Sequence, residues 1–277
     1  MSERKRIFIV VKTYPTISKE YSELVCTAGI LEDGSWIRLY PVPFRKLDWE
    51  HKYHKYTWVD IEAERNTKDF RPETYRPVLE TISITDHSII KDWEERRRII
   101  FNNKKIYTNM QELIGKAKAD RTSLAVFKPT KVNDFIFKKV DRDWDKDKLS
   151  ILEGLSKQMN FFQTPNEISD EFKTVPKVPY EFSYVFEDDC GNKSTLMIED
   201  WEVGMLYFNC LKKANGNELI ALSKVKKKFL TYFNTRDLHF FLGTTIRFHN
   251  VAPNPFIIIG VFYPPVQNNQ KQMSFFN

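Results

Sequence analysis

The spacing of apolar and polar residues predicts that the first part of the chain is built from short β-strands. The strands expected on this basis span residues 6–12, 23–30, 35–40, 56–64 and 78–85. Asp33 and Gly34 separate two of these apolar runs, and an Asp-Gly pair in that position is typical of a tight hairpin. Short strands with turn residues between them are typical of a small closed barrel of the OB type.

The rest of the chain mixes helical and strand patterns. Amphipathic helical spacing follows residue 86, and Asp200 fits the N-cap position of a later helix. A charged and then proline-punctuated stretch separates the two halves. We therefore expect an N-terminal OB-like β-barrel domain with a helical extension over 1–140, a linker over 141–179, a C-terminal α+β domain over 180–265 and a flexible tail over 266–277. The expected fold class is α+β, with two β-rich, OB-like barrel lobes and inserted helices.

Composition narrows the classes of protein that fit. Hydrophobic residues make up 42% and charged residues 29% of the 277 positions, which excludes a disordered chain. The formal net charge of +6 is compatible with a nucleic-acid partner without proving one. Cys26, Cys190 and Cys210 lie far apart, which argues against a disulfide framework and a zinc ribbon. No apolar run is long enough to cross a bilayer and the N-terminus lacks a secretory signal, so we expect a cytoplasmic protein without membrane contact.

The hairpin carries a pattern that suits nucleic acid. Trp36, Arg38 and Tyr40 share one face of a strand, with Ile37 and Leu39 on the other. If exposed, the first face would stack bases and pair with phosphates, as OB barrels do with single strands. In the alternative, the aromatic rings face the barrel interior and Arg38 forms a local ion pair. Further candidate nucleic-acid contacts are Lys12, Arg45, Lys224 and Lys228, although the last two also fit a solvated helix face.

The same hairpin resembles a known pattern. From Cys26 to Arg38 the sequence reads C-T-A-G-I, then D-G-S-W-I-R. This is similar to the C-x-A-G…G-x-W-I-R pattern of a family of poorly characterised microbial proteins described as having dual OB domains. The resemblance implies a nucleic-acid-related role and specifies no reaction.

The end of the chain resembles a docking peptide. After Pro264 and Pro265 the residues are polar, yet the chain ends on apolar side chains. The stretch that carries these apolar side chains consists of Gln272, Met273, Ser274, Phe275 and Phe276. It resembles the bacterial motif that binds the DNA sliding clamp, which implies that the glutamine amide forms hydrogen bonds and the apolar side chains fill two pockets. In the alternative, the terminal phenylalanines fold back onto the body of the protein.

A catalytic site is not evident from motifs, since nucleotide-binding and hydrolase signatures are absent from the sequence. The nearest acidic cluster comprises Glu199, Asp200 and Glu202, where a strand meets a helix. A metal-dependent nuclease needs such carboxylates to converge on a cation, and Asp60 or Glu62 could complete the set. In the alternative, Asp200 caps the helix and Glu202 interacts with the positive end of its dipole. We expect neither a bound metal nor a cofactor.

The sequence therefore leads to one expected function and two alternatives. We expect a nucleic-acid-binding protein, with DNA as its partner, that acts in replication, repair or defence against foreign DNA. Its tail is expected to recruit it to a sliding clamp. The first alternative is a metal-dependent nuclease or other DNA-processing enzyme recruited in the same way. The second is a protein-interaction scaffold that does not contact nucleic acid.

Overall fold

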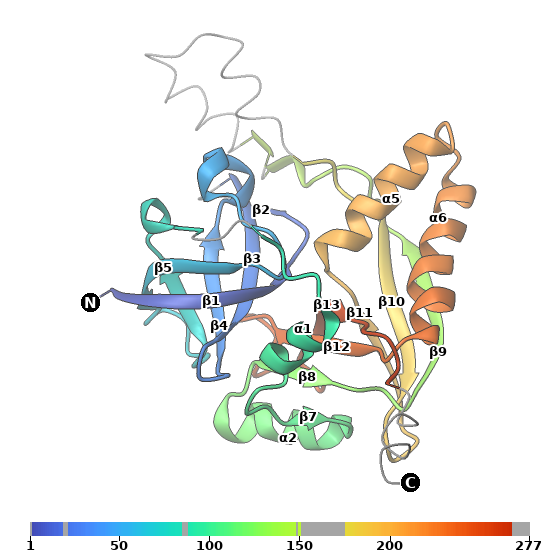
Figure 1. Cartoon of the computed structure of the whole chain (residues 1–277). Coiled ribbons are helices and arrows are strands. Elements are labelled where there is room, and N and C mark those ends of the chain that lie inside the picture. The colour runs from blue at the N-terminus through green and yellow to red at the C-terminus, as the bar shows by residue number, and fades with distance from the viewer. Residues whose placement is uncertain (1, 19–21, 85–87, 148, 151–174, 268–277) are drawn as a thin grey trace, which may run out of the picture.

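A computed structural model describes most of the chain. The described residues are 2–18, 22–84, 88–147, 149–150 and 175–267. The clamp-like peptide at residues 272–276 and most of the expected linker lie outside them. The protein is an α+β protein with two lobes (Figure 1). Within the described residues, none of the helices is both long enough and apolar enough to span a membrane.

The first lobe is a closed five-stranded β-barrel, drawn in blue and cyan in Figure 1. Its strands, with a short flanking strand β2, are β1 (Glu3–Lys12), β2 (Thr16–Ser18), β3 (Ser22–Leu31), β4 (Trp36–Val42), β5 (Trp58–Arg65) and β6 (Thr74–Pro77). The barrel order is β1-β5-β6-β4-β3, and β3 pairs back with β1 to close the ring. All of these pairings are antiparallel except β4 with β6. This is the strand order of an OB barrel, as expected from the sequence.

Alternation along the strands fills the barrel. The side chains that point inward and are almost fully buried include Ile7, Ile9, Ile37, Leu39, Val59 and Ile61. Burying each such side chain stabilises the fold by about 1.5–3 kcal/mol. The last strand differs from the expectation, since it lies at Thr74–Pro77 and a 3-10 turn, Leu79–Thr81, follows it. The Thr81 hydroxyl donates to the Val78 carbonyl at 2.7 Å, and this local bond closes a turn within the apolar run.

The second lobe contains two sheets and the larger helices. Its described strands are β7 (Ile106–Tyr107), β8 (Leu124–Phe127), β9 (Lys131–Lys139), β10 (Tyr180–Glu187), β11 (Lys193–Met197), β12 (His239–Thr244) and β13 (Phe256–Phe262). One sheet has the order β11-β10-β9 and the other β13-β12-β8-β7, so neither repeats the closed ring of the first lobe. The described helices are α1 (Trp93–Ile100), which precedes this lobe, α2 (Met110–Asp120), α5 (Trp201–Lys213) and α6 (Glu218–Lys226). Figure 1 shows α5 and α6 alongside β10 and β9, and their side chains share one apolar core.

The boundary between the lobes differs from the one expected at 141–179. Strand β8 pairs with β12, and β9 pairs with β10. Residues from β7 onward therefore belong to the second lobe, and the stretch at 141–179 connects two neighbouring strands of one sheet. The local pattern shows that β8 and β9 are strands, but their partners lie far along the chain and leave no local signal.

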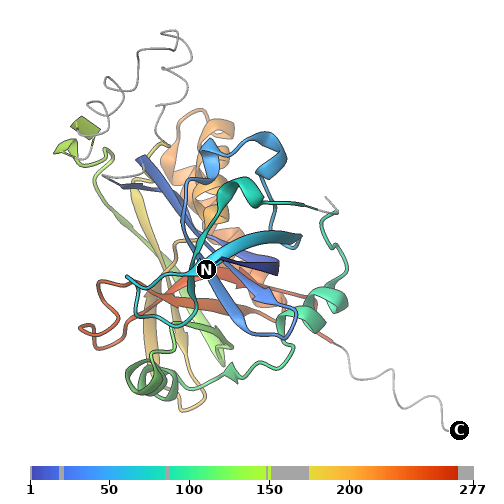
Figure 2. The same ribbon diagram turned by 90° about the vertical axis from the view of Figure 1, so that its left-hand side faces the viewer.

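The two lobes pack through the outer face of the barrel. The cluster between them includes Phe8, Ile30 and Trp36 from the barrel and Phe241 and Phe262 from the second lobe. The rings of Trp36 and Phe241 meet edge to face, with their centroids 5.8 Å apart. Figure 2 shows β12 and β13 crossing the barrel strands, and their connecting loop lies at the edge near α2. The outer face of β4 is therefore an internal surface of the protein.

Candidate functional site

Three adjoining hollows share lining residues, and two of them lie between the barrel and the second lobe, while the remaining one lies within the second lobe. The interlobe hollow, of about 290 Å³, lies between β3 and β4 of the barrel and the β12–β13 strands. It shares Ile257 with a larger groove of about 680 Å³ beside α2. It shares Thr16 and Glu199 with a third hollow of about 220 Å³, which is lined by Trp144 and Tyr180. We call this set of hollows the seam trench.

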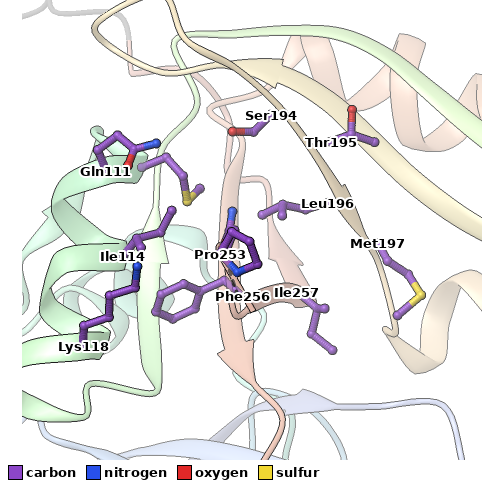
Figure 3. A pocket seen from close by; sticks show the side chains of 12 residues that line it. Gln111, Ile114, Lys118, Ser194, Thr195, Leu196, Met197, Pro253, Phe256 and Ile257 are labelled. Carbon is purple, nitrogen blue, oxygen red and sulfur yellow. Dashed lines mark hydrogen bonds between the residues drawn. The ribbon is translucent and has the colours of Figure 1, made fainter. Parts of the chain in front are cut away.

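The α2 groove forms the open end of the seam trench (Figure 3). Gln111 and Lys118 of α2 lie on one side, and residues 194–197 of β11 lie on the other. Phe256 and Pro253, from the start of β13 and the loop before it, lie between these two walls in Figure 3. β11 is an edge strand of its sheet and β13 is an edge strand of the other, so the groove lies where the two sheet edges diverge.

Strand alternation on β4 places the face that carries Trp36, Arg38 and Tyr40, the aromatic stripe, on the outside of the barrel. One of the two interpretations of the sequence required this placement. Trp36, Arg38 and Tyr40 share the outer face, while the residues between them point into the barrel core. The second lobe covers most of this face, because Trp36 packs on Phe241 and Arg38 is only 2% exposed. Tyr40, 37% exposed, lines the interlobe hollow. The stripe is thus mainly a contact between the lobes.

Arg38 is held in place by both lobes. Its guanidinium donates to the Thr74 hydroxyl at 3.1 Å and to the Ser123 hydroxyl and carbonyl at 2.8 and 3.1 Å. The Ser123 hydroxyl in turn donates to the Glu73 carboxylate at 2.8 Å. A buried charge is tolerated where hydrogen bonds replace its hydration, and these bonds do so. The guanidinium is therefore a fixed part of the floor of the interlobe hollow.

Arg71, which the sequence analysis did not single out, is a second buried cation at this floor. It donates to both carboxylate oxygens of Asp69 and to the backbone carbonyl of Thr244. The Thr244 hydroxyl and His249 Nδ1 are 2.8 Å apart, and His249 Nε2 is 3.1 Å from the Ala117 carbonyl. These contacts attach the β12–β13 loop to the barrel and to α2. No sequence signal connects them, because Arg71 and Thr244 lie in different halves of the chain.

Glu199 lies where the interlobe hollow meets the third hollow and lines both. Its backbone N–H donates to the Ile258 carbonyl and its carbonyl accepts from the Tyr14 N–H, each at 2.9 Å. Within the described residues, no hydrogen bond or ion pair occupies its carboxylate. Burial raises the pKa of this carboxyl, and the nearby Glu181 carboxylate adds to the rise. The backbone of Glu199 is therefore fixed on both sides at the place where the two hollows adjoin.

Asp200 and Glu202, the other members of the acidic cluster, do not converge with Glu199. Asp200 caps α5 by accepting from the Glu202 N–H at 2.7 Å, which is the structural alternative stated for it. The Lys55 ammonium lies 3.1 Å from Asp200 and 3.3 Å from Glu202. Burial lowers the pKa of Lys55, but these carboxylates more than offset it, so its pKa ends above the ordinary value. No cluster of metal-ligating side chains occurs within the part of the chain that the structure describes.

Two candidate nucleic-acid contacts near the barrel are engaged by the protein itself. Lys12 Nζ lies 4.1 Å from the centroid of the Phe44 ring and donates to the Tyr53 carbonyl at 3.2 Å. Burial lowers the pKa of Lys12 to about 8. Arg45 forms an ion pair with Glu23 at 2.5 Å. Both side chains stabilise the region around the seam.

The remaining two candidates lie on the helices of the second lobe. Lys224 is exposed on α6, whereas Lys228 is half-buried and lies 4.1 Å from the centroid of the Tyr232 ring. Strand β9 runs beside α6 (Figure 1). Both elements carry exposed lysines. We call the exposed lysines of α5, α6, the turn after α6 and β9 the basic edge: Lys138, Lys139, Lys212, Lys213, Lys224 and Lys227.

The fold and the trench define a two-lobe α+β protein with an N-terminal OB-order barrel and a hollow between the lobes. Two family models cover almost the whole chain. Residues 106–277 match a domain of unknown function, DUF8757, and residues 3–102 match another, DUF8758. The first match spans more than half of the chain, which therefore belongs to the DUF8757 family. The two matches meet just before β7, where the structure divides the lobes. No curated protein matches the sequence.

Proposed function

We propose that this protein binds DNA, acts in replication, repair or defence against foreign DNA, and is recruited to a sliding clamp by its C-terminal peptide. The observation that carries the binding proposal is the basic edge, whose strand β9 and turn after α6 also carry exposed aromatic rings. Phe137 on β9 is 39% exposed and Tyr232 after α6 is 36% exposed. Lysines that neutralise phosphates and rings that stack on bases are the two components of single-strand binding surfaces.

Two acidic side chains beside the basic edge form ion pairs with other basic residues, while Glu181 lies opposite Lys138 in the β9–β10 ladder. Glu218 at the start of α6 is paired with Arg142, and Asp134 on β9 is paired with Lys226 at 2.7 Å. Neither of these carboxylates is paired with a lysine of the basic edge. The formal net charge of +6 agrees with a positive field that attracts a polyanion.

The seam trench extends from this edge toward the barrel. Lys139 pairs in register with Tyr180, which lines the third hollow beside Trp144. OB barrels commonly bind ligands on the outer face of the strands equivalent to β3 and β4. In this protein the second lobe covers that face, and the trench is the part of it left accessible. A strand bound at the basic edge would therefore reach the barrel through the trench.

The alternative of a metal-dependent nuclease has less support from the geometry. Two of the three carboxylates expected to act together are held by Lys55, and Asp200 also caps α5. Clamp recruitment is supported by the resemblance of residues 272–276 to the clamp-binding motif. The described chain ends near α1, where the Gln267 amide donates to Glu94 at 2.8 Å.

The experiment is a titration of fluorescently labelled single-stranded and duplex DNA with the full chain at several salt concentrations. The double variant Lys224→Glu, Lys227→Glu should weaken binding at least tenfold and lower the slope of log affinity against log salt by about 2. A matched control reverses two exposed lysines of the first half, Lys68→Glu and Lys91→Glu, and should change both quantities much less. DNA binding that is absent at low salt, or equally weakened by both variants, would contradict the proposal.

Recruitment is tested separately with a chain that lacks residues 272–277. This chain should bind DNA as the full chain does and should lose its binding to a purified bacterial sliding clamp. A clamp that binds both chains equally, or neither, would contradict this part of the proposal.

A further inference from the structure

The interlobe hollow has the size and the lining of a site for one planar heterocycle. Its volume of about 290 Å³ is close to the lower limit of the range of about 300–1,000 Å³ that is usual for small-molecule pockets. Its apolar walls are the side chains of Ile246, Ile257 and Ile259, and the Tyr40 ring adds an aromatic surface. Such a cavity accepts a flat ring system, while a folded peptide would exceed it.

The polar groups of the hollow determine which hydrogen-bonding groups a bound ring must carry. Among the described residues that line it, Glu199 supplies the only carboxylate, and no protein donor occupies that carboxylate. A carboxylate held against apolar walls needs N–H or O–H donors from its ligand, because buried acceptors without partners are costly. The ligand must therefore present donors at one edge and apolar faces elsewhere.

The two arginines at the floor of the interlobe hollow do not make it a binding site for an anion. Arg71 donates to Asp69 and the Thr244 carbonyl, and Arg38 donates to Thr74 and Ser123. A phosphate in the hollow would compete with these acceptors and would face the Glu199 carboxylate. Nucleic acid would therefore enter base first, with its backbone outside.

We propose that the interlobe hollow binds an unstacked guanine base and that Glu199 reads it, an inference that rests on the proposed DNA-binding function. Guanine carries an N1–H and a 2-amino N–H side by side, so they meet the two oxygens of one carboxylate, as in bidentate carboxylate pairs. Adenine and cytosine offer an amino group without an adjacent ring N–H, and thymine offers a single ring N–H. The Tyr40 ring and the isoleucine walls contact the faces of the base, as in other sites that hold a base outside the stack.

The test compares guanosine monophosphate with inosine monophosphate, which differs only in lacking the 2-amino group. Calorimetric titration of the full chain should show guanosine monophosphate binding about 5- to 150-fold more tightly, the range expected for a bidentate base contact. Glu199→Gln should abolish this preference, because an amide presents one acceptor and one donor group. Glu181→Gln, which changes a carboxylate of the third hollow that does not line the interlobe hollow, should keep it. Thermal unfolding of each variant shows whether it is folded.

The same comparison in DNA separates this inference from the proposed function. Replacing the guanines of a bound oligonucleotide by hypoxanthine should weaken its binding to the full chain and leave its binding to Glu199→Gln unchanged. If DNA binds through the basic edge but ignores this replacement, the guanine site is wrong and the proposed function stands. If guanosine monophosphate is preferred but no DNA binds, the proposed function is wrong and the site stands. Equal binding of both nucleotides, or of neither, overturns the guanine site.

Discussion

Two polar centres on the seam begin from adjacent residues, Glu199 and Asp200, and differ in how their charges are satisfied. Asp200 is fully buried, caps α5 and lies 3.1 Å from the Lys55 ammonium. Glu199 faces the interlobe hollow, and the described residues provide its carboxylate with no donor. Side chains of successive residues in extended backbone point in opposite directions, so one acidic cluster supplies both a structural ion pair and an accessible carboxylate. Acidic residues that are neighbours in sequence therefore need not share a role.

Among the substitutions that test this difference between Glu199 and Asp200, the largest effect is expected when the Asp200 side chain is removed. Asp200→Ala leaves the Lys55 charge buried with only Glu202 as partner and removes the cap of α5. We expect the free energy of unfolding to fall by about 3–5 kcal/mol, as measured by urea denaturation. Glu202→Ala is the control, because the Glu202 side chain is 46% exposed and should contribute less than about 1 kcal/mol. Equal losses from the two variants would show that Lys55 does not depend on Asp200.

A smaller effect is expected at the floor of the interlobe hollow. Arg38→Met removes the donors that connect β4 to Thr74 and Ser123 and leaves those oxygens without these partners. We expect a loss of about 2 kcal/mol in the free energy of unfolding, by the same denaturation assay. Arg98→Met, at an exposed position of α1, should stay within about 0.5 kcal/mol of the original protein. An unchanged stability of Arg38→Met would show that the floor does not join the lobes.

The smallest effect, and one of opposite sign, is expected for Glu199→Gln. Because the pKa of Glu199 is raised in the folded protein, the folded state retains its proton over a pH range where the unfolded chain has lost it. The carboxyl therefore makes stability fall as pH rises from the ordinary glutamate pKa through the raised value. Glu199→Gln should remove this part of the pH dependence and be at least as stable as the original protein at pH 7. Clear destabilisation at pH 7 would assign Glu199 a structural partner.

The pattern of apolar and polar residues predicts much of the first lobe, but it does not predict how the two lobes pack against each other. Alternation and the Asp33-Gly34 turn predict the barrel, since both signals are local to the strands they describe. Alternation also places Trp36 and Arg38 on one face. What covers that face depends on β12, about two hundred positions further along the chain, and a single sequence carries no record of that contact.

The candidate site was likewise predicted from the sequence only in part. The acidic cluster can be recognised in the sequence because its members are close together. The different roles of Glu199 and Asp200 depend on Lys55, which belongs to the other lobe. Arg71 was missed because its partner in the second lobe is the backbone carbonyl of Thr244, and any residue type can supply a carbonyl. The boundary between the lobes differs from the expected linker because β8 pairs with β12, far along the chain, and β9 pairs with β10 across the stretch expected to be the linker.

The packing of β12 and β13 on the barrel has a consequence for synthesis on the ribosome. The barrel strands are made before Phe241 and Phe262, which cover Phe8 and Trp36 in the folded protein. A newly made barrel therefore displays an apolar surface until β12 and β13 have also been made. Messages truncated before β12 should yield a product that aggregates or is held by chaperones, even though its barrel strands are intact.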